Sequence, residues 1–228
     1  MKIHRFFSPS IDKTDEITIS DRDLVHQMHN VLKLQNGEFV ELFDGSGDAL
    51  LGEIGDVSKK SLILNKKEVK SVEDTRKDIF AYIPLLKRSN TELMIQKLTE
   101  LGIKNIIPIK TDRTIKSDVN LDRLKKISLE ATEQSGQYFL SKISEPIKLK
   151  DAIEIASGTD IFVLDMGRES FRDNKRDYPL SFFIGPEGGW TDEERELFKG
   201  SSAKIVSLTE TTLRGETAAI NAAYESLV

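Results

Sequence analysis

The sequence predicts an α/β protein in two parts, a small β-barrel of residues 1–72 followed by an α/β domain of residues 73–228. Two observations support this prediction. Apolar residues before about residue 73 form short β-type runs, whereas later apolar strands alternate with helical segments. Strands separated by helices are typical of a parallel sheet, in which ligands bind at the carboxyl edge.

The first part is predicted to contain short strands and one helix. Residues 38–43 and 60–64 are β-type runs, and residues 44–47 supply turn residues. Residues 21–32 have helical character. Residues 69–77 are polar and lack a clear period, so they are predicted to form a linker.

The second part is predicted to contain five strands, at residues 78–84, 105–109, 160–165, 180–184 and 203–208. Capping boxes, in which a hydroxyl and a carboxylate bind backbone amides, predict helix starts at residues 89–92 and 191–194. Gly102 and Gly200 mark the ends of these two helices. Further helices are predicted at residues 120–137 and 216–227.

Composition excludes several classes of protein and site. The 228 residues contain no apolar run long enough to span a bilayer and no secretory signal, so we expect a cytoplasmic protein. The chain has no cysteine, which excludes disulfides and thiol catalysis. Its three histidines all fall in the first thirty residues, so no metal site is expected.

The net charge of −5 argues against a protein that coats nucleic acid, so any RNA contact must be a local patch. Residues 87–133 carry ten Lys or Arg against seven Asp or Glu. A pair of solvated helix faces would explain the same excess, and the sequence leaves both interpretations open.

Two loops near the end of the chain point to a binding site. Residues 183–191 read FIGPEGGWT, and residues 213–219 read LRGETAA. Glycines allow a backbone to approach a ligand closely, and both loops follow predicted strands, so they are expected to frame one pocket at the carboxyl edge. A tight structural turn at residues 185–189 is the alternative. Neither loop has a dinucleotide or nucleotide-triphosphate fingerprint.

An ordered series of motifs resembles the RsmE family of SPOUT methyltransferases over the whole chain. Besides the two loops, residues 96–103 (QKLTELGI) and 130–135 (EATEQS) resemble family motifs of the second domain. Residues 29–33 (HNVLK) resemble its PUA-like RNA-binding barrel. The resemblance implies methylation of N3 of one uridine, conventionally position 1498, in 16S ribosomal RNA of the small subunit. It also implies S-adenosylmethionine as cofactor, a homodimer, and a trefoil knot within residues 78–228.

Site residues follow from the chemistry and from the resemblance. Uracil N3 carries a proton at neutral pH, so transfer needs a base and a group that stabilises charge on the flanking oxygens. Arg214 and Glu216 are predicted for these roles, with Glu187 as the rival base; an Arg214–Glu216 pair that merely braces the loop is the alternative. The predicted cofactor-binding residues are Leu164, Asp165, Gly167, Gly185, Glu187, Gly188, Gly189, Leu208, Leu213, Arg214, Thr217 and Ala218. The predicted RNA-binding residues are Arg5, Lys33, Lys87, Arg88, Arg113, Arg123 and Gln134.

The chain departs from the family pattern at three positions. Gln137 and Lys33 stand where the family usually has arginine, and a lysine cannot form the bidentate fork. Thr209 stands where the family usually has glycine beside the cofactor, so cofactor affinity is expected to differ. Three other functions are weighed against the expected one: a SPOUT enzyme that methylates a ribose 2′-hydroxyl, a catalytically idle RNA-binding protein, and a nicotinamide oxidoreductase, which has the least support because its fingerprint is absent.

Overall fold

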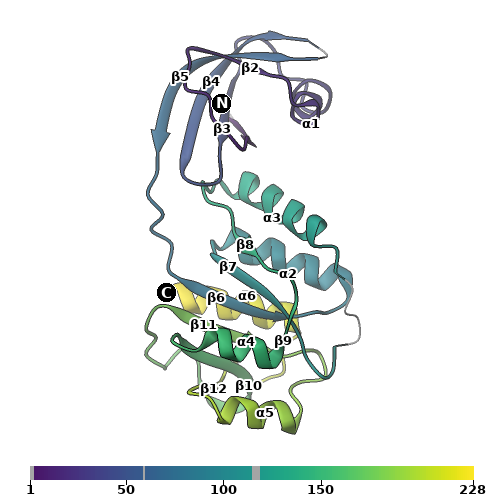
Figure 1. Ribbon diagram of the computed structural model, residues 1–228, viewed down its shortest axis with the longest axis vertical. Coiled ribbons are helices and arrows are strands. Elements are labelled where there is room, and N and C mark those ends of the chain that lie inside the picture. Colours follow the sequence, from purple (N-terminus) through teal and green to yellow (C-terminus); the bar gives the residue numbers. More distant parts are fainter. Residues whose placement is uncertain (1–2, 59, 115–118) are drawn as a thin grey trace. The chain divides into compact units, whose positions relative to one another are not determined.

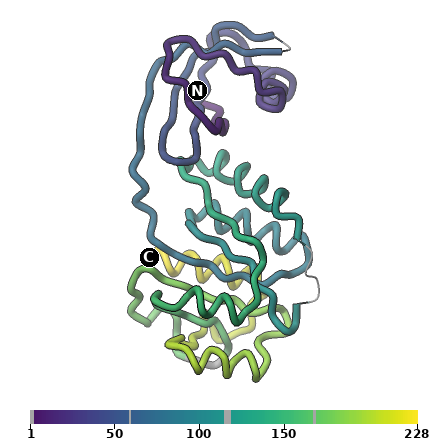
Figure 2. The backbone as a smooth tube through the Cα atoms, viewed as in Figure 1, coloured from purple at the N-terminus to yellow at the C-terminus, as the bar shows by residue number. Residues whose placement is uncertain are grey.

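The computed structural model describes residues 3–58, 60–114 and 119–228, with all of their side chains except those of residues 167 and 168 (Figure 1). The chain divides into two compact units. The N-terminal unit comprises residues 1–75 and 132–140, and the C-terminal unit comprises residues 76–131 and 141–228. Figure 2 traces the backbone through both units.

The N-terminal unit is built on a five-stranded sheet with the order β1-β3-β4-β5-β2. Strands β1 and β3 are parallel, and the other neighbours are antiparallel. Apolar side chains such as Val40, Leu42 and Leu50 form its core. The strands are β1 His4–Phe7, β2 Glu16–Ile19, β3 Phe39–Phe43, β4 Asp48–Val57 and β5 Leu62–Ser71.

The helical segment predicted at residues 21–32 is confirmed, but it changes character part-way. Helix α1 (Arg22–His26) begins at Asp21, whose carboxylate accepts the Leu24 amide at 2.9 Å, and a π-helical turn follows at Gln27–Val31. The linker predicted to begin at residue 69 is wrong in its first residues. Strand β5 continues to Ser71, because pairing with β4 gives these polar residues backbone partners.

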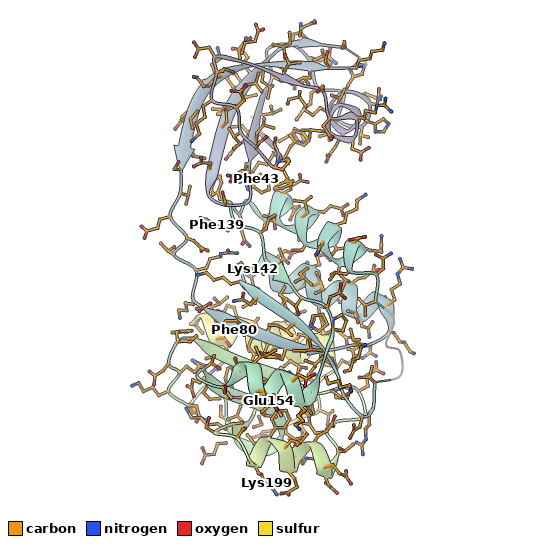
Figure 3. All side chains as sticks on the ribbon, viewed as in Figure 1. Phe43, Phe80, Phe139, Lys142, Glu154 and Lys199 are labelled. Atoms are coloured by element: carbon orange, nitrogen blue, oxygen red, sulfur yellow. The ribbon has the colours of Figure 1, made fainter. Side chains whose placement is uncertain are left out.

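Residues 132–140 join the N-terminal unit through contacts that are distant in sequence. The Leu140 amide donates to the Gly45 carbonyl at 3.0 Å, and the Phe7 amide donates to Glu133 Oε1 at 2.8 Å. A Cβ atom at Gly47 would lie 2.9 Å from the ring of Phe139, which Figure 3 labels together with Phe43 of the same unit.

The C-terminal unit contains a parallel sheet, as the alternation of strands and helices predicts. Its strand order is β12-β10-β11-β6-β7-β8, and β9 also pairs with β7; every pairing is parallel. The carboxyl ends of these strands therefore meet at one edge. The strands are β6 Ile79–Pro84, β7 Asn105–Lys110, β8 Lys142–Ile143, β9 Ile147–Lys148, β10 Asp160–Ser170, β11 Leu180–Ile184 and β12 Lys204–Ser207.

Helices cover both faces of this sheet (Figure 1). On one face, α2 (Arg88–Glu100), α3 (Leu121–Ser135) and α6 (Gly215–Leu227) contribute Leu98, Leu124 and Ala222, among others, to one apolar core. On the other, α4 (Leu149–Ala156) and α5 (Asp192–Lys199) contribute Leu149 and Phe198 to a second core.

One of the two predicted capping boxes is present. At the start of α5, Thr191 and Glu194 bind each other's backbone amides as predicted. The box predicted at residues 89–92 is wrong, because α2 begins already at Arg88. Glu92 consequently lies within the helix, where it pairs with Arg88 and Arg123.

Candidate active site

A cleft of about 920 Å³ lies at the carboxyl edge of the parallel sheet. The middle of β10, the end of β11 and the loops after β11 and β12 line it, together with Lys87 and Asn90 at the start of α2. The prediction that the two loops frame one pocket is therefore confirmed.

The glycine loop, residues 185–190, is held at both of its ends. Its Gly189 has φ +70°, a conformation that favours glycine, and the Gly189 amide donates to the Pro186 carbonyl at 2.8 Å. Trp190 is 1% exposed and donates from Nε1 to the Leu164 carbonyl at 3.1 Å. A Cβ atom at Gly185 would lie 3.1 Å from the Trp190 ring, so the loop packs tightly on this indole.

The second loop, residues 209–214, is more exposed. Thr209, Thr211, Thr212 and Arg214 are all exposed, and Thr209 Oγ1 donates to the Thr211 carbonyl at 2.7 Å. Arg214 is the N-cap residue of α6, and its carbonyl accepts the Ala218 amide at 2.8 Å. Within the described part of the chain, the Arg214 guanidinium forms no ion pair, so an Arg214–Glu216 brace is not supported.

The two candidate bases differ in their surroundings. Glu187 is exposed and lines the cleft. Glu216 is 8% exposed and does not line it, and its Oε2 accepts a hydrogen bond from Asn90 Nδ2 at 3.4 Å. Asn90 itself lines the cleft, and the sequence did not predict it, because a polar residue in the first turn of a helix carries no distinguishing signal.

Most residues predicted to bind the cofactor lie together. Thr217 is exposed on α6 but does not line the cleft, and Gly167 lies in β10, outside the residues whose side-chain surroundings are described. The predicted residues that line the cleft are Leu164, Asp165, Gly185, Glu187, Gly188, Gly189, Leu208, Leu213, Arg214 and Ala218.

Asp165 meets a partner that the sequence did not predict. Arg195 of α5, which also lines the cleft, donates from Nε to Asp165 Oδ2 at 2.9 Å and pairs with Asp192 at 3.2 Å. The hydrogen bond that Arg195 donates to Asp165 is the main cause that raises the pKa of Arg195. This pair ties the middle of β10 to α5 beside the cleft.

The predicted RNA-binding residues of the N-terminal unit have different surroundings. Lys33 is exposed with φ 55°, a rare conformation for lysine, and Gln134 is exposed. The side chain of Arg5 is only 12% exposed. It pairs with Glu41 at 3.6 Å, donates to the Gln137 carbonyl at 3.1 Å, and lies over the rings of Phe43 and Tyr138. These contacts are those of a residue that holds the unit together.

The predicted RNA-binding residues of the C-terminal unit lie in two places, at the cleft and around Glu92 on the surface of α2. Lys87 lines the cleft, and Arg113 donates to the carbonyl of Gly188. Arg88 and Arg123 both bind Glu92 on the surface of α2, and their hydrogen bonds lower the pKa of Glu92 to about 2. The structure thus brings two of these four residues to the cleft or its glycine loop.

Comparison with known families shows what kind of protein carries this cleft. Residues 73–225 match the RNA methyltransferase domain, and residues 20–67 match the RNA methyltransferase PUA domain. The chain belongs to the RNA methyltransferase family. The family resemblance seen in the sequence is thereby confirmed.

Related proteins cover nearly the whole chain of this RNA methyltransferase. Ribosomal RNA small subunit methyltransferase E of Rickettsia conorii is 29% identical over 229 residues, which cover 97% of this chain and 94% of that protein. The solved structure of Ribosomal RNA small subunit methyltransferase E from Neisseria gonorrhoeae, bound to S-adenosyl methionine, has a TM-score of 0.88 at 24% identity and covers 98% of this chain and 96% of its own. A probable rRNA-methyltransferase from Porphyromonas gingivalis has a TM-score of 0.85 at 25% identity, over 97% of this chain and 96% of its own. These likenesses support the fold described above.

Two features are absent from the described residues of this RNA methyltransferase. Among them, no cluster of three or more His, Asp or Glu side chains is arranged to hold a metal ion. No helix in the described ranges is long and apolar enough to cross a membrane.

Proposed function

We propose that this chain is an S-adenosylmethionine-dependent enzyme that methylates 16S ribosomal RNA of the small subunit, at N3 of a single uridine, conventionally position 1498. The observation that carries the proposal is the cleft at the carboxyl edge, where the glycine loop faces Arg214. Membership of the RNA methyltransferase family and the names of the relatives support the reaction and the RNA.

The cleft suits S-adenosylmethionine in size and lining. Its volume of about 920 Å³ is in the range of small-molecule sites. Leu164, Ile184 and Leu208 offer apolar surface for an adenine ring, and the glycines leave backbone groups uncovered for polar contacts. When bound, S-adenosylmethionine supplies an electrophilic methyl group.

The chain's own residues would then prepare the uracil. Arg214, exposed at the cleft, stabilises the negative charge that develops on the carbonyl oxygens beside N3. Glu187 accepts the N3 proton, because its carboxylate is exposed in the cleft whereas Glu216 is buried behind Asn90. Glu216 and Asn90 hold the start of α6 against α2, which keeps Arg214 in place.

Assembly, chain path and location are part of the same proposal. We propose a homodimer formed through the C-terminal unit, a trefoil knot within residues 78–228, and action in the cytoplasm on ribosomal RNA. The family resemblance supports all three. Sedimentation that shows a monomer at micromolar concentration would contradict the dimer, and an experimental trace without a threaded chain would contradict the knot.

Product analysis tests the reaction. Purified protein, small-subunit RNA and methyl-labelled S-adenosylmethionine are incubated, and the RNA is digested to nucleosides for mass analysis. We expect labelled N3-methyluridine, which is also expected to be missing from ribosomal RNA of a strain that lacks the chain. A ribose-methylated nucleoside would identify a 2′-hydroxyl methyltransferase, and cofactor binding without transfer would identify an idle RNA-binding protein.

A further inference from the structure

The loop of residues 111–114, which we call the β7 loop because it follows β7, touches the glycine loop. The Arg113 guanidinium donates from Nη1 to the carbonyl oxygen of Gly188. Its stem packs on the same residue, because a Cβ atom at Gly188 would lie 2.9 Å from Arg113 Cδ. Any larger side chain at position 188 would therefore push Arg113 away from the carbonyl that it binds.

A buried carboxylate fixes the β7 loop to the start of α5. Glu194 is 2% exposed, and its two oxygens accept the backbone amides of Asp112 at 2.9 Å and Thr191 at 2.8 Å. Thr191 donates in turn to the Asp112 carboxylate at 3.1 Å. Hydrogen bonds to a charged acceptor are stronger than neutral ones, so this junction is firm.

The β7 loop also closes on itself. The Thr111 amide donates to Thr114 Oγ1 at 2.9 Å, and the Thr114 amide donates to the Thr111 carbonyl at 3.0 Å. Arg113 therefore reaches the glycine loop from a short turn that is held internally and by Glu194.

We infer that Arg113 is a positioning residue, which fixes the Gly188 carbonyl and with it the backbone of the glycine loop that receives S-adenosylmethionine. The inference rests on the proposed function and deepens it, because it assigns to the cofactor side a residue that the sequence predicts to contact RNA. A loop ordered before binding loses less conformational freedom when the ligand arrives, which strengthens binding.

Calorimetric titration of the full chain with S-adenosylmethionine tests this role. In Arg113→Ala the Kd for S-adenosylmethionine is expected to rise about tenfold, which corresponds to a loss of about 1.4 kcal/mol in binding free energy. Arg113→Lys is expected to recover only part of the loss, because lysine keeps the charge but not the planar fork. Steady-state transfer is expected to show a raised KM for the cofactor with kcat within about twofold of the parent, a split that general unfolding would not produce.

Two further variants serve as a second test and as a control. Glu194→Gln places an amide donor against a backbone amide, so it is expected to raise the same Kd. Arg172→Ala is the matched control: this exposed arginine pairs with Glu225, outside the cleft lining, and is expected to bind the cofactor as the parent does.

The outcomes separate the inference from the proposed function. An unchanged cofactor Kd in Arg113→Ala overturns the inference, and a salt-dependent loss of RNA affinity alone would identify a phosphate contact instead. An equal loss in Arg172→Ala also overturns it, because the effect would then come from net charge. A parent protein that binds no S-adenosylmethionine would contradict the proposed function itself.

Discussion

The two loops that frame the cleft differ in how firmly the rest of the unit holds them. The glycine loop is tied to β10 through Trp190, to the β7 loop through Arg113, and to itself through Gly189. The loop of residues 209–214 is mostly exposed, and the hydrogen bond from Thr209 to Thr211 lies within it.

This difference suggests that the two loops have different roles. A loop with buried anchors is already ordered before a ligand arrives, whereas an exposed loop with few contacts opens at low cost in free energy. We expect the glycine loop to set cofactor affinity and the loop before α6 to bring Arg214 to the RNA base.

The largest expected effect comes from removing the main anchor of the glycine loop. Trp190→Ala deletes a fully buried indole and should lower the free energy of unfolding by about 3–5 kcal/mol, with a parallel loss of cofactor affinity. Trp190→Phe keeps most of the packing but leaves the Leu164 carbonyl without its hydrogen-bond donor. The free energy of unfolding is therefore expected to fall by about 1–3 kcal/mol. Chemical denaturation measures both, and a Trp190→Ala protein as stable as the parent would show that the loop is not held this way.

A substitution in the exposed loop of residues 209–214 should affect the transfer rate rather than stability. Arg214→Ala should lower the single-turnover transfer rate by about 10²–10³ while cofactor affinity and stability change little, since the guanidinium acts on developing charge and braces no described partner. Arg214→Lys, which keeps the charge, serves as the control. If Arg214→Ala lost both cofactor affinity and stability, the residue would have a structural role, and the two loops would not differ in the way described.

Much of the C-terminal unit could be predicted because its local signals agree with its packing. Strand β11 is buried throughout and apolar at every position except Ser181, and Thr191 and Glu194 form the expected capping box. Strands β8 and β9 have two residues each, too few to show a period, and were missed. Helix α4 was also missed.

The site could be predicted only where one segment carried the signal. The glycine loop follows β11 directly and Arg214 lies in the loop after β12, whereas Asn90 and Arg195 reach the cleft through the packing of α2 and α5. The grouping of residues 132–140 with the N-terminal unit depends equally on contacts across the sequence. The domain boundary at residue 73 and the roles of the site residues stay predictions.

A smaller effect is expected from the departure at position 209. Thr209→Gly removes the hydrogen bond to the Thr211 carbonyl and gives the backbone more conformational freedom. Cofactor binding should therefore weaken by about 0.5–1 kcal/mol in free energy. Thr209→Ser keeps the hydroxyl and should bind nearly as the parent does. If Thr209→Gly bound more tightly, the Cβ atom would be an obstacle to the cofactor, and the loop would be less adaptable than its exposure suggests.

The smallest effect concerns α2, whose start contributes Lys87 and Asn90 to the cleft and is held by charge rather than by a capping box. Hydrogen bonds from Arg123 and then Arg88 lower the pKa of Glu92 to about 2, below its ordinary 4.5. A carboxyl group with a lowered pKa stabilises the folded state above its unfolded pKa, and this contribution disappears as the pH falls from about 4.5 towards 2.

Glu92→Gln removes this contribution at every pH. The parent should therefore exceed the variant in unfolding free energy at pH 7, by less than about 1 kcal/mol because the pair is at the surface, and the gap should close as the pH falls towards 2. Urea titrations of both proteins across this range measure the gap. Cofactor affinity at pH 7 should be the same in both, since Glu92 touches neither loop; a lower affinity in Glu92→Gln would mean that α2, too, must be held in place for the cleft to bind.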